Sequence, residues 1–285
     1  MISIQTNVAA LYGLQNLQKT QMQEQNTIEQ MTSGFRINTA ADDPAGLAQA
    51  NQLRNMGATL SQGVANGNNA VGQLQIIDGG LSNISQILDR LQTLATQGSS
   101  STFTGSFTTL ATEFVNDAAE ITRQASNIGL NSGGNFNAAL TVYVGGGLGN
   151  ANGNTIGAPT ETIALNGAAN NVDATGLSLA SFAASNLTNA ANFQAAVTAV
   201  AAAVTSLGAV QGTVGAGINQ LNFAVSLAGS QITNYSAAQS QLRDANMAQE
   251  ATNLSQQQVL MQSSMAALAQ ANQIPQSVLK LVQGA

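Results

Sequence analysis

The sequence predicts a mainly α-helical protein that carries a small β-hairpin region. Apolar residues recur at helical spacing over about the first 130 residues and again from about residue 191 to the end. The segment between these zones is rich in Gly, Asn and Thr and contains two short strand candidates. Because both ends of the chain carry apolar stripes, we expect the two terminal helices to pair as a coiled coil.

The composition indicates that the protein works as an assembly. Of its 285 residues, 44% are hydrophobic and only 7% are charged, whereas charged residues make up about 25% of an ordinary soluble domain. A monomer with so few charges has little to keep its apolar faces from associating.

Charge and residue usage argue against several functions. The net charge of −6, with only two lysines, disfavours binding to nucleic acid or to anionic membranes. The absence of His and Cys removes imidazole-based triads, disulfides and zinc sites of the Cys/His type. We therefore expect no catalytic residue, no cofactor and no metal.

Neither a leader nor a membrane span is expected from the sequence. The first residues, "MISIQTNVAALYG", lack the basic segment and apolar run of a secretory signal. No stretch approaches the roughly 20 apolar residues that a membrane span requires. Export would then use another signal.

Two adjacent carboxylates follow the first helical segment. Gly34 suits the end of a helix, while Asp43 and Pro44 suit the N-cap and first position of the next one. Asp42 and Asp43 could instead form an acid/base or metal site, but no histidine or carboxylate cluster accompanies them. We interpret the stretch as a cap and hinge, with Arg36 a candidate partner for either carboxylate, within one chain or between subunits.

The remaining elements follow in order along the chain. Helices are predicted over residues 44–97, 107–127 and 191–242. Strand candidates at 140–144 and 161–166 flank a Gly/Asn-rich loop and predict a hairpin, and a turn with a short strand is expected over 172–182. The glycine run at 145–153 departs from the G-x-G-x-x-G pattern, so a hairpin loop is favoured over a nucleotide site.

The last segment carries an apolar stripe with alternating steps of four and three residues, as in a coiled-coil seam. One polar residue interrupts it. The stripe consists of Met247, Ala251, Leu254, Gln258, Met261, Met265 and Leu268.

Three separated motifs then give the chain a family resemblance. "NTAADDPAGLAQANQLR" (38–54), "SLGAVQGTVGAGINQL" (206–221) and "ALAQANQIPQSVLKLVQ" (267–283) resemble, in this order, sequences typical of bacterial flagellins. The resemblance implies a structural subunit that polymerises into the extracellular helical filament used for swimming, without catalysis. It is similar to a minimal form that lacks the outer variable domains.

The resemblance also implies a domain arrangement. Residues 1–43 and 243–285 would form an inner coiled-coil domain, and residues 44–242 a helical rod domain with a hairpin region at about 135–185. Asp42 and Asp43 would mark the join between the two. The apolar positions of the ends should be buried partly within one chain and fully between chains: Ile4, Val8, Leu11, Leu254, Met261, Met265, Leu268, Leu279 and Val282.

Several partners are implied by the same resemblance. They are further copies of the chain, the flagellar export apparatus, a flagellin chaperone, the filament cap and the hook-associated proteins. Arg90, Leu94 and Glu113 match the rod-domain patch that Toll-like receptor five recognises in the family, although Gln92 and Thr93 replace a common arginine and glutamate. Packing and subunit contacts are the alternative role of these residues.

Two other functions compete with this interpretation. A hook–filament junction protein shares flagellin-like ends, but the strength of the terminal motifs favours flagellin. An enzyme carried on the filament is disfavoured, because the middle zone is short and the absence of His removes an H-E-x-x-H site.

Overall fold

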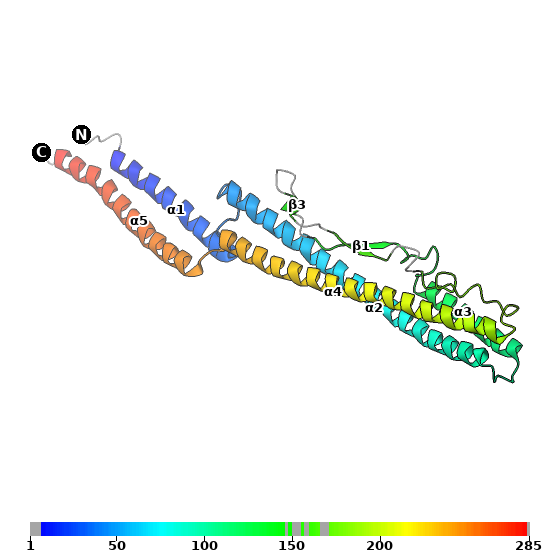
Figure 1. Ribbon diagram of the computed structural model, residues 1–285. Helices are drawn as coiled ribbons and strands as arrows, with labels where there is room; N and C mark the ends of the chain where they lie inside the picture. The colour runs from blue at the N-terminus through cyan, green and yellow to red at the C-terminus, as the bar shows by residue number, and fades with distance from the viewer. Residues whose placement is uncertain (1–6, 146–147, 150–154, 157–159, 166–170, 284–285) are drawn as a thin grey trace. The chain divides into compact units, whose positions relative to one another are not determined.

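The computed structural model describes residues 7–145, 148–149, 155–156, 160–165 and 171–283, with the side chains of the last helix described as far as Gln273. Long helices dominate, and small antiparallel strand pairs complete the described secondary structure (Figure 1). The predicted fold class, mainly α with a β-hairpin, is confirmed. The chain forms two compact units, one from Met1–Asn55 with Asn234–Ala285 and one from Met56–Thr233.

The first unit is built on the two terminal helices, α1 (Val8–Ser33) and α5 (Met247–Gln283), which lie side by side (Figure 1). The pair is antiparallel. At one end the Asn7 side chain donates a hydrogen bond to the carbonyl of Ala271 (2.9 Å), and nearer the other end Gln257 Nε2 donates to Thr27 Oγ1 (3.0 Å).

The seam of this helix pair differs from the predicted one. On α5 the half-buried positions include Leu254, Met261 and Leu268, as expected, but they alternate with Gln257 and Ser264. The other members of the predicted seam are instead exposed, on a neighbouring stripe of α5: Met247, Ala251, Gln258 and Met265.

The reason for this difference lies on α1. Its buried and half-buried positions repeat by three and four residues and are mostly small or polar: Ala10, Gly13, Leu17, Thr20, Glu24 and Thr27. Such a face accepts a polar partner, because the Thr27 hydroxyl pairs with Gln257. It also allows close approach, since a Cβ at Gly13 would lie in van der Waals contact with Leu268, 3.6 Å from its nearest atoms.

The second unit contains most of α2 (Pro44–Ser99) and α4 (Ala190–Arg243), together with α3 (Phe107–Asn127). All three helices contribute buried apolar residues to this unit. At Gly98 a Cβ would lie 2.4 Å from the Phe193 ring, so only glycine lets α2 and α4 approach there. The largest fully buried side chains are Phe114, Phe193, Leu60, Leu74, Ile77, Leu81, Ile84, Leu88, Leu91, Ile121, Leu130 and Leu165.

A hairpin covers these helices. Strand β1 (Ala139–Tyr143) pairs antiparallel with β4 (Thr160–Ala164), with Leu140 opposite Ile163, while the short strands β2 (Leu148–Gly149) and β3 (Thr155–Ile156) pair separately. Ile163 packs on α4 at Gly217, where a Cβ would lie 2.8 Å from it. The predicted hairpin is therefore present.

The segment after the hairpin, 172–182, forms turns where a short strand was expected. Asp173 explains the difference. Its Oδ1 accepts the N–H of Gly176 (2.8 Å), and its carbonyl accepts the N–H of Leu177 (2.9 Å). An Asx-type turn thus captures the backbone groups that a strand would have needed.

Helix α4 departs from another expectation. By length and composition it is apolar enough to cross a membrane, with a mean hydropathy of 1.7 over its most apolar window, of which 33% is buried. Within the second unit, α4 places a regular stripe of residues in the core, among them Phe193, Val200, Leu207, Val214 and Leu221. Long core helices pass the same test, so the finding is weak as a sign of a span.

Candidate assembly surface

The two carboxylates of the stretch 32–48 each serve a turn of their own chain. Asp43 Oδ1 accepts the N–H of Gly46 (2.9 Å) and caps α2, which starts at Pro44. Asp42 Oδ2 accepts the N–H groups of Thr39 (2.9 Å) and Asn38 (3.1 Å) and the Thr39 hydroxyl (3.1 Å). These bonds, led by that from the Thr39 N–H, hold the pKa of Asp42 below its ordinary value.

Arg36 pairs with neither carboxylate among the described residues, which corrects the expectation for a pair within one chain. Its Nη2 donates instead to the carbonyl of Leu242 at the end of α4 (2.9 Å), and its backbone N–H donates to the carbonyl of Arg243 (2.6 Å). A carbonyl at a helix C-terminus is a good acceptor for a cation. We call the paired segments Gly34–Ile37 and Leu242–Ala245 the clasp.

Gly34 ends α1 and begins the clasp. Its φ of 75° lies in the left-handed region, and its N–H bonds the carbonyl of Gln30 (2.9 Å). Its own carbonyl accepts the N–H of Ala245 (2.9 Å). Gly34 thus ends α1 and also hydrogen-bonds to the segment that precedes α5.

The outer faces of α1 and α5 carry bulky apolar side chains exposed to solvent. We define these outer faces by ten residues, which are ten of the fifteen exposed large hydrophobic residues in the described part of the chain: Val8, Leu11, Tyr12, Leu14, Met22, Ile28, Met247, Val259, Leu260 and Met265. Tyr12 is 65% exposed and Val259 64%. Exposed bulky apolar side chains gathered on two neighbouring helices make these helices candidates for an interaction site.

The nine residues expected to form an assembly core fall into three groups. Val8, Leu11 and Met265 lie on the outer faces, whereas Leu254, Met261 and Leu268 are half-buried in the seam. Ile4 lies outside the described residues, as do the side chains of Leu279 and Val282.

The three residues of the expected receptor patch lie in the second unit. Arg90 of α2 forms an ion pair with Glu113 of α3, and their side chains are 57% and 43% exposed. Leu94 is buried, at 2% exposure. Next to this pair, burial and the charge of Glu113 raise the pKa of Asp117.

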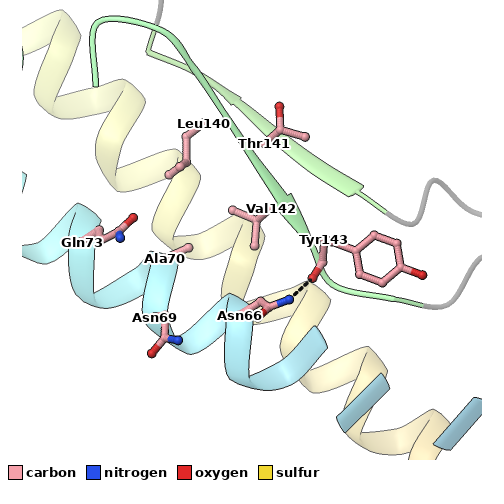
Figure 2. A pocket seen from close by; sticks show the side chains of 8 residues that line it. All are labelled: Asn66, Asn69, Ala70, Gln73, Leu140, Thr141, Val142 and Tyr143. Atoms are coloured by element: carbon pink, nitrogen blue, oxygen red, sulfur yellow. Dashed lines mark hydrogen bonds between the residues drawn. The ribbon is translucent and has the colours of Figure 1, made fainter. Parts of the chain in front are cut away.

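A groove of about 270 Å³ runs between α2 and β1 in the second unit (Figure 2). Asn66, Asn69, Ala70 and Gln73 line it from the helix, and residues 140–143 line it from the strand. Asn66 Nδ2 donates to the carbonyl of Tyr143 (3.2 Å), as the dashed line in Figure 2 shows. Among the residues that the structure describes, those lining the groove are uncharged.

Across the described part of the chain, no three His, Cys, Asp or Glu residues lie close enough together to hold a metal ion. Of the glycine run 145–153, only Gly145, Leu148 and Gly149 are among the described residues. The most prominent feature of the described terminal helices is therefore the set of ten bulky apolar side chains that their pairing leaves exposed.

Comparison with known proteins identifies the family. The family model described as the bacterial flagellin N-terminal helical region matches residues 4–134, and the one described as the C-terminal helical region matches residues 197–282. A flagellin of Halalkalibacterium halodurans and one of Bacillus subtilis are each 30% identical, over 98% of this chain and 99% of their own length. The chain belongs to the bacterial flagellin family.

Other similar proteins carry related names. The flagellar filament 33 kDa core protein of Treponema phagedenis is 28% identical over 98% of this chain and 99% of its own length. The crystal structure of Bacillus cereus flagellin is 23% identical, with a TM-score of 0.42, and covers 61% of this chain and 94% of that chain.

Membership of this family assigns a structural role. The protein is a structural subunit of the bacterial flagellar filament, which is extracellular. The names of the matched relatives favour the filament over the hook–filament junction. The family is one of structural proteins and not of enzymes.

Proposed function

We propose that the outer faces of α1 and α5 are the surfaces through which subunits join in the filament. In this proposal residues 1–43 and 243–285 form the inner domain, and residues 44–242 form the rod. The single observation that carries it is the concentration of exposed bulky hydrophobic residues on these two helices, ten of fifteen in the described chain.

The chemistry of the seam supports this assignment. Thr20, Glu24 and Thr27 of α1 and Gln257 and Ser264 of α5 are buried or half-buried along the seam. The seam thus takes in five polar residues beside its leucines and Met261, while ten bulky apolar residues of the two helices stay exposed. Fully burying one such side chain contributes about 1.5–3 kcal/mol. Ten half-exposed side chains therefore offer on the order of 10 kcal/mol per subunit to an interface.

The geometry of such contacts would determine the shape of the polymer. The outer faces of α1 and α5 carry different side chains, so joining one to the other uses two different patches. Contacts between unlike patches that do not close into a ring generate an open helix. This is the form that a filament requires.

Point substitutions on the outer faces test the proposal. Leu11→Gln and Val259→Gln replace exposed apolar side chains without touching the seam, and Gln15→Ala is a control at an exposed position of α1. We expect the first two to lower the fraction of protein that sediments as filaments by about tenfold, and the control to leave it unchanged. Wild-type yields of filaments from both Gln variants, judged by sedimentation and electron microscopy, would overturn the proposal.

Truncation tests the domain assignment separately. Removal of residues 1–30 or 256–285 is expected to abolish filament formation and to leave the rod helical by circular dichroism. If either truncated protein still polymerises, the assignment of the ends to the inner domain is wrong.

We extend the proposal to export and chemistry on the strength of the family resemblance. The protein would leave the cell through the flagellar export apparatus without cleavage of a signal peptide, assisted by a flagellin chaperone, and would meet the hook-associated proteins and the filament cap. The intact mass of subunits from sheared filaments would show whether a signal peptide has been cleaved. No catalysis would be involved, and protease activity of purified filaments would contradict this.

Recognition by Toll-like receptor five is a second proposal, carried by the exposed Arg90–Glu113 pair. The buried Leu94 would act only by supporting α2 and α3. In a reporter-cell assay with soluble monomer, Arg90→Gln should weaken the response and Arg123→Gln, at another exposed ion pair of α3, should not. Absence of any wild-type response at saturating dose would remove this role.

A further inference from the structure

The clasp lies at the end of the α1–α5 pair where α1 ends and α5 begins, and two arginines hold it together. We propose that Arg36 and Arg243 are positioning residues that set the register of α1 against α5 before subunits join. The inference rests on the proposed function, because register decides which side chains make up each outer face.

The seam by itself specifies register weakly. Knobs-into-holes packing fixes register when large apolar side chains interlock, but α1 presents Gly13, Thr20 and Thr27 to α5. A slip of α5 by one heptad would place Met261 where Leu268 now meets Gly13, which exchanges one bulky apolar side chain for another.

One polar pair in the seam opposes such a slip. Gln257 Nε2 donates to Thr27 Oγ1 at 3.0 Å, and a single polar contact of this kind sets register in many coiled coils. The Gln257 amide is only half satisfied, however, because its Oε1 is buried and has no hydrogen-bond partner among the described residues. A second device would make the register secure.

The clasp has the geometry of such a device. Its two backbone hydrogen bonds run in opposite directions, from Arg36 N–H to the carbonyl of Arg243 (2.6 Å) and from Ala245 N–H to the carbonyl of Gly34 (2.9 Å). They form a short antiparallel bridge. Gly34 directly follows α1, and Ala245 lies two residues before α5, so sliding one helix along the other must break this bridge.

The side chains of the two arginines reinforce the bridge reciprocally. Arg36 Nη2 donates to the carbonyl of Leu242 (2.9 Å), and Arg243 Nε donates to the carbonyl of Ile37 (3.4 Å). Each arginine thus binds the segment that carries the other. The guanidinium carbon of Arg243 also lies 4.1 Å from the centre of the Phe35 ring, in a cation–π contact.

A lysine cannot replace Arg243 in this arrangement. The guanidinium group is planar, so it stacks on the ring and donates from Nε at the same time, whereas an ammonium group is a compact point charge. Arg243→Lys therefore keeps the positive charge but removes the simultaneous stacking on Phe35 and hydrogen bond from Nε. Arg54→Lys, at an exposed position of α2, is the matched control.

Disulfide trapping reads the register directly, because the chain has no cysteine of its own. A Cβ at Gly13 would lie 3.8 Å from the Cβ of Leu268, which is the usual separation in a disulfide. The full-length variant Gly13→Cys/Leu268→Cys reports the native register. Gly13→Cys/Met261→Cys reports a slip of one heptad, and mild oxidation followed by digestion and mass analysis counts the bonds formed within one subunit.

With the clasp intact, the bond between positions 13 and 268 should form in clear excess over that between 13 and 261. Arg243→Lys should lower this ratio about fivefold, as loss of one cation–π contact of about 1 kcal/mol would. Phe35→Leu should act in the same direction, and Arg54→Lys should not act. Helix content from circular dichroism confirms that each variant is folded.

Two results would overturn the inference. One is an unchanged ratio in both clasp variants, and the other is a slipped bond that forms as readily as the native one in the intact clasp. The readout lies within one subunit and does not need a filament. Failure of the wild-type chain to polymerise would therefore refute the proposed function while leaving the clasp to be judged by its own ratio.

Discussion

Replacing Gly46 with alanine should destabilise the start of α2, although the same change inside most helices is stabilising. Glycine in a helix costs about 0.5–1 kcal/mol relative to alanine. Here a Cβ would lie 2.4 Å from Oδ2 of Asp43 and 2.8 Å from Cδ1 of Ile37. Overlaps of this kind cost about 1–3 kcal/mol, so the net effect is a loss of about 1–2 kcal/mol.

The cap carboxylate is the cause of most of this clash, which makes the prediction testable by a cycle of variants. Asp43→Ala alone removes the hydrogen bond to the Gly46 N–H and should cost about 1 kcal/mol. In that background the alanine at 46 meets only the end of the Ile37 side chain, which can move. Gly46→Ala should then be neutral or stabilising, so the double variant should be no less stable than Asp43→Ala.

Hydrogen exchange measures these local differences directly. It is preferable to global unfolding here, because a chain with two compact units need not unfold in a single two-state transition. The Leu47 N–H bonds the carbonyl of Asp43 (3.0 Å) and reports the first turn of α2. Each 1.4 kcal/mol should change its exchange rate tenfold. Slower exchange in Gly46→Ala, or strictly additive effects in the double variant, would refute the reasoning.

Three further substitutions and one pH titration have defined outcomes. Gly63→Ala places a Cβ 1.8 Å from the carbonyl oxygen of Val144 and should destabilise the second unit by about 3 kcal/mol or more in thermal unfolding, whereas Gly72→Ala, with open space around it, should stabilise α2 by up to about 1 kcal/mol. Asp117→Asn should raise the Tm of the second unit at pH 7, because burial raises the pKa of Asp117 and its charged form therefore costs stability; the gain should vanish in acid, where Asp117 binds a proton. The turn held by Asp42 should persist above the ordinary carboxyl pKa of 3.8 and open only as the pH falls through the lower folded value, which an NMR titration of the turn amides would show; a midpoint above 3.8 would contradict this.

Local sequence signals predicted much of the fold because their causes are local. The left-handed conformation at Gly34 and the Asp43–Pro44 helix start depend on neighbouring residues, and α1 ends and α2 begins at these positions. Likewise α3 spans Phe107–Asn127, as the spacing of its apolar residues predicts. Turns replace the predicted strand at 172–182 because the side chain of Asp173 accepts a hydrogen bond from a backbone N–H that a strand would have used.

Long-range choices could not be predicted from the same signals. Two adjacent stripes on α5 are apolar enough to form a seam, and periodicity alone does not say which one meets α1 and which one faces outward. The outcome depends on Thr27 and Gly13, more than 200 residues away. The partner of Arg36, the backbone carbonyl of Leu242, is similarly distant in the sequence. Every residue type has such a carbonyl, so no sequence pattern identifies it as the acceptor.

The polar seam of the terminal helices has a consequence for the control of growth. In a lone subunit the clasp and the seam pair α1 with α5, but ten bulky apolar side chains of these helices remain in water. A subunit that joins an existing tip would bury those side chains against its neighbours. We therefore expect a critical concentration, below which subunits stay apart and above which filaments lengthen only at their ends.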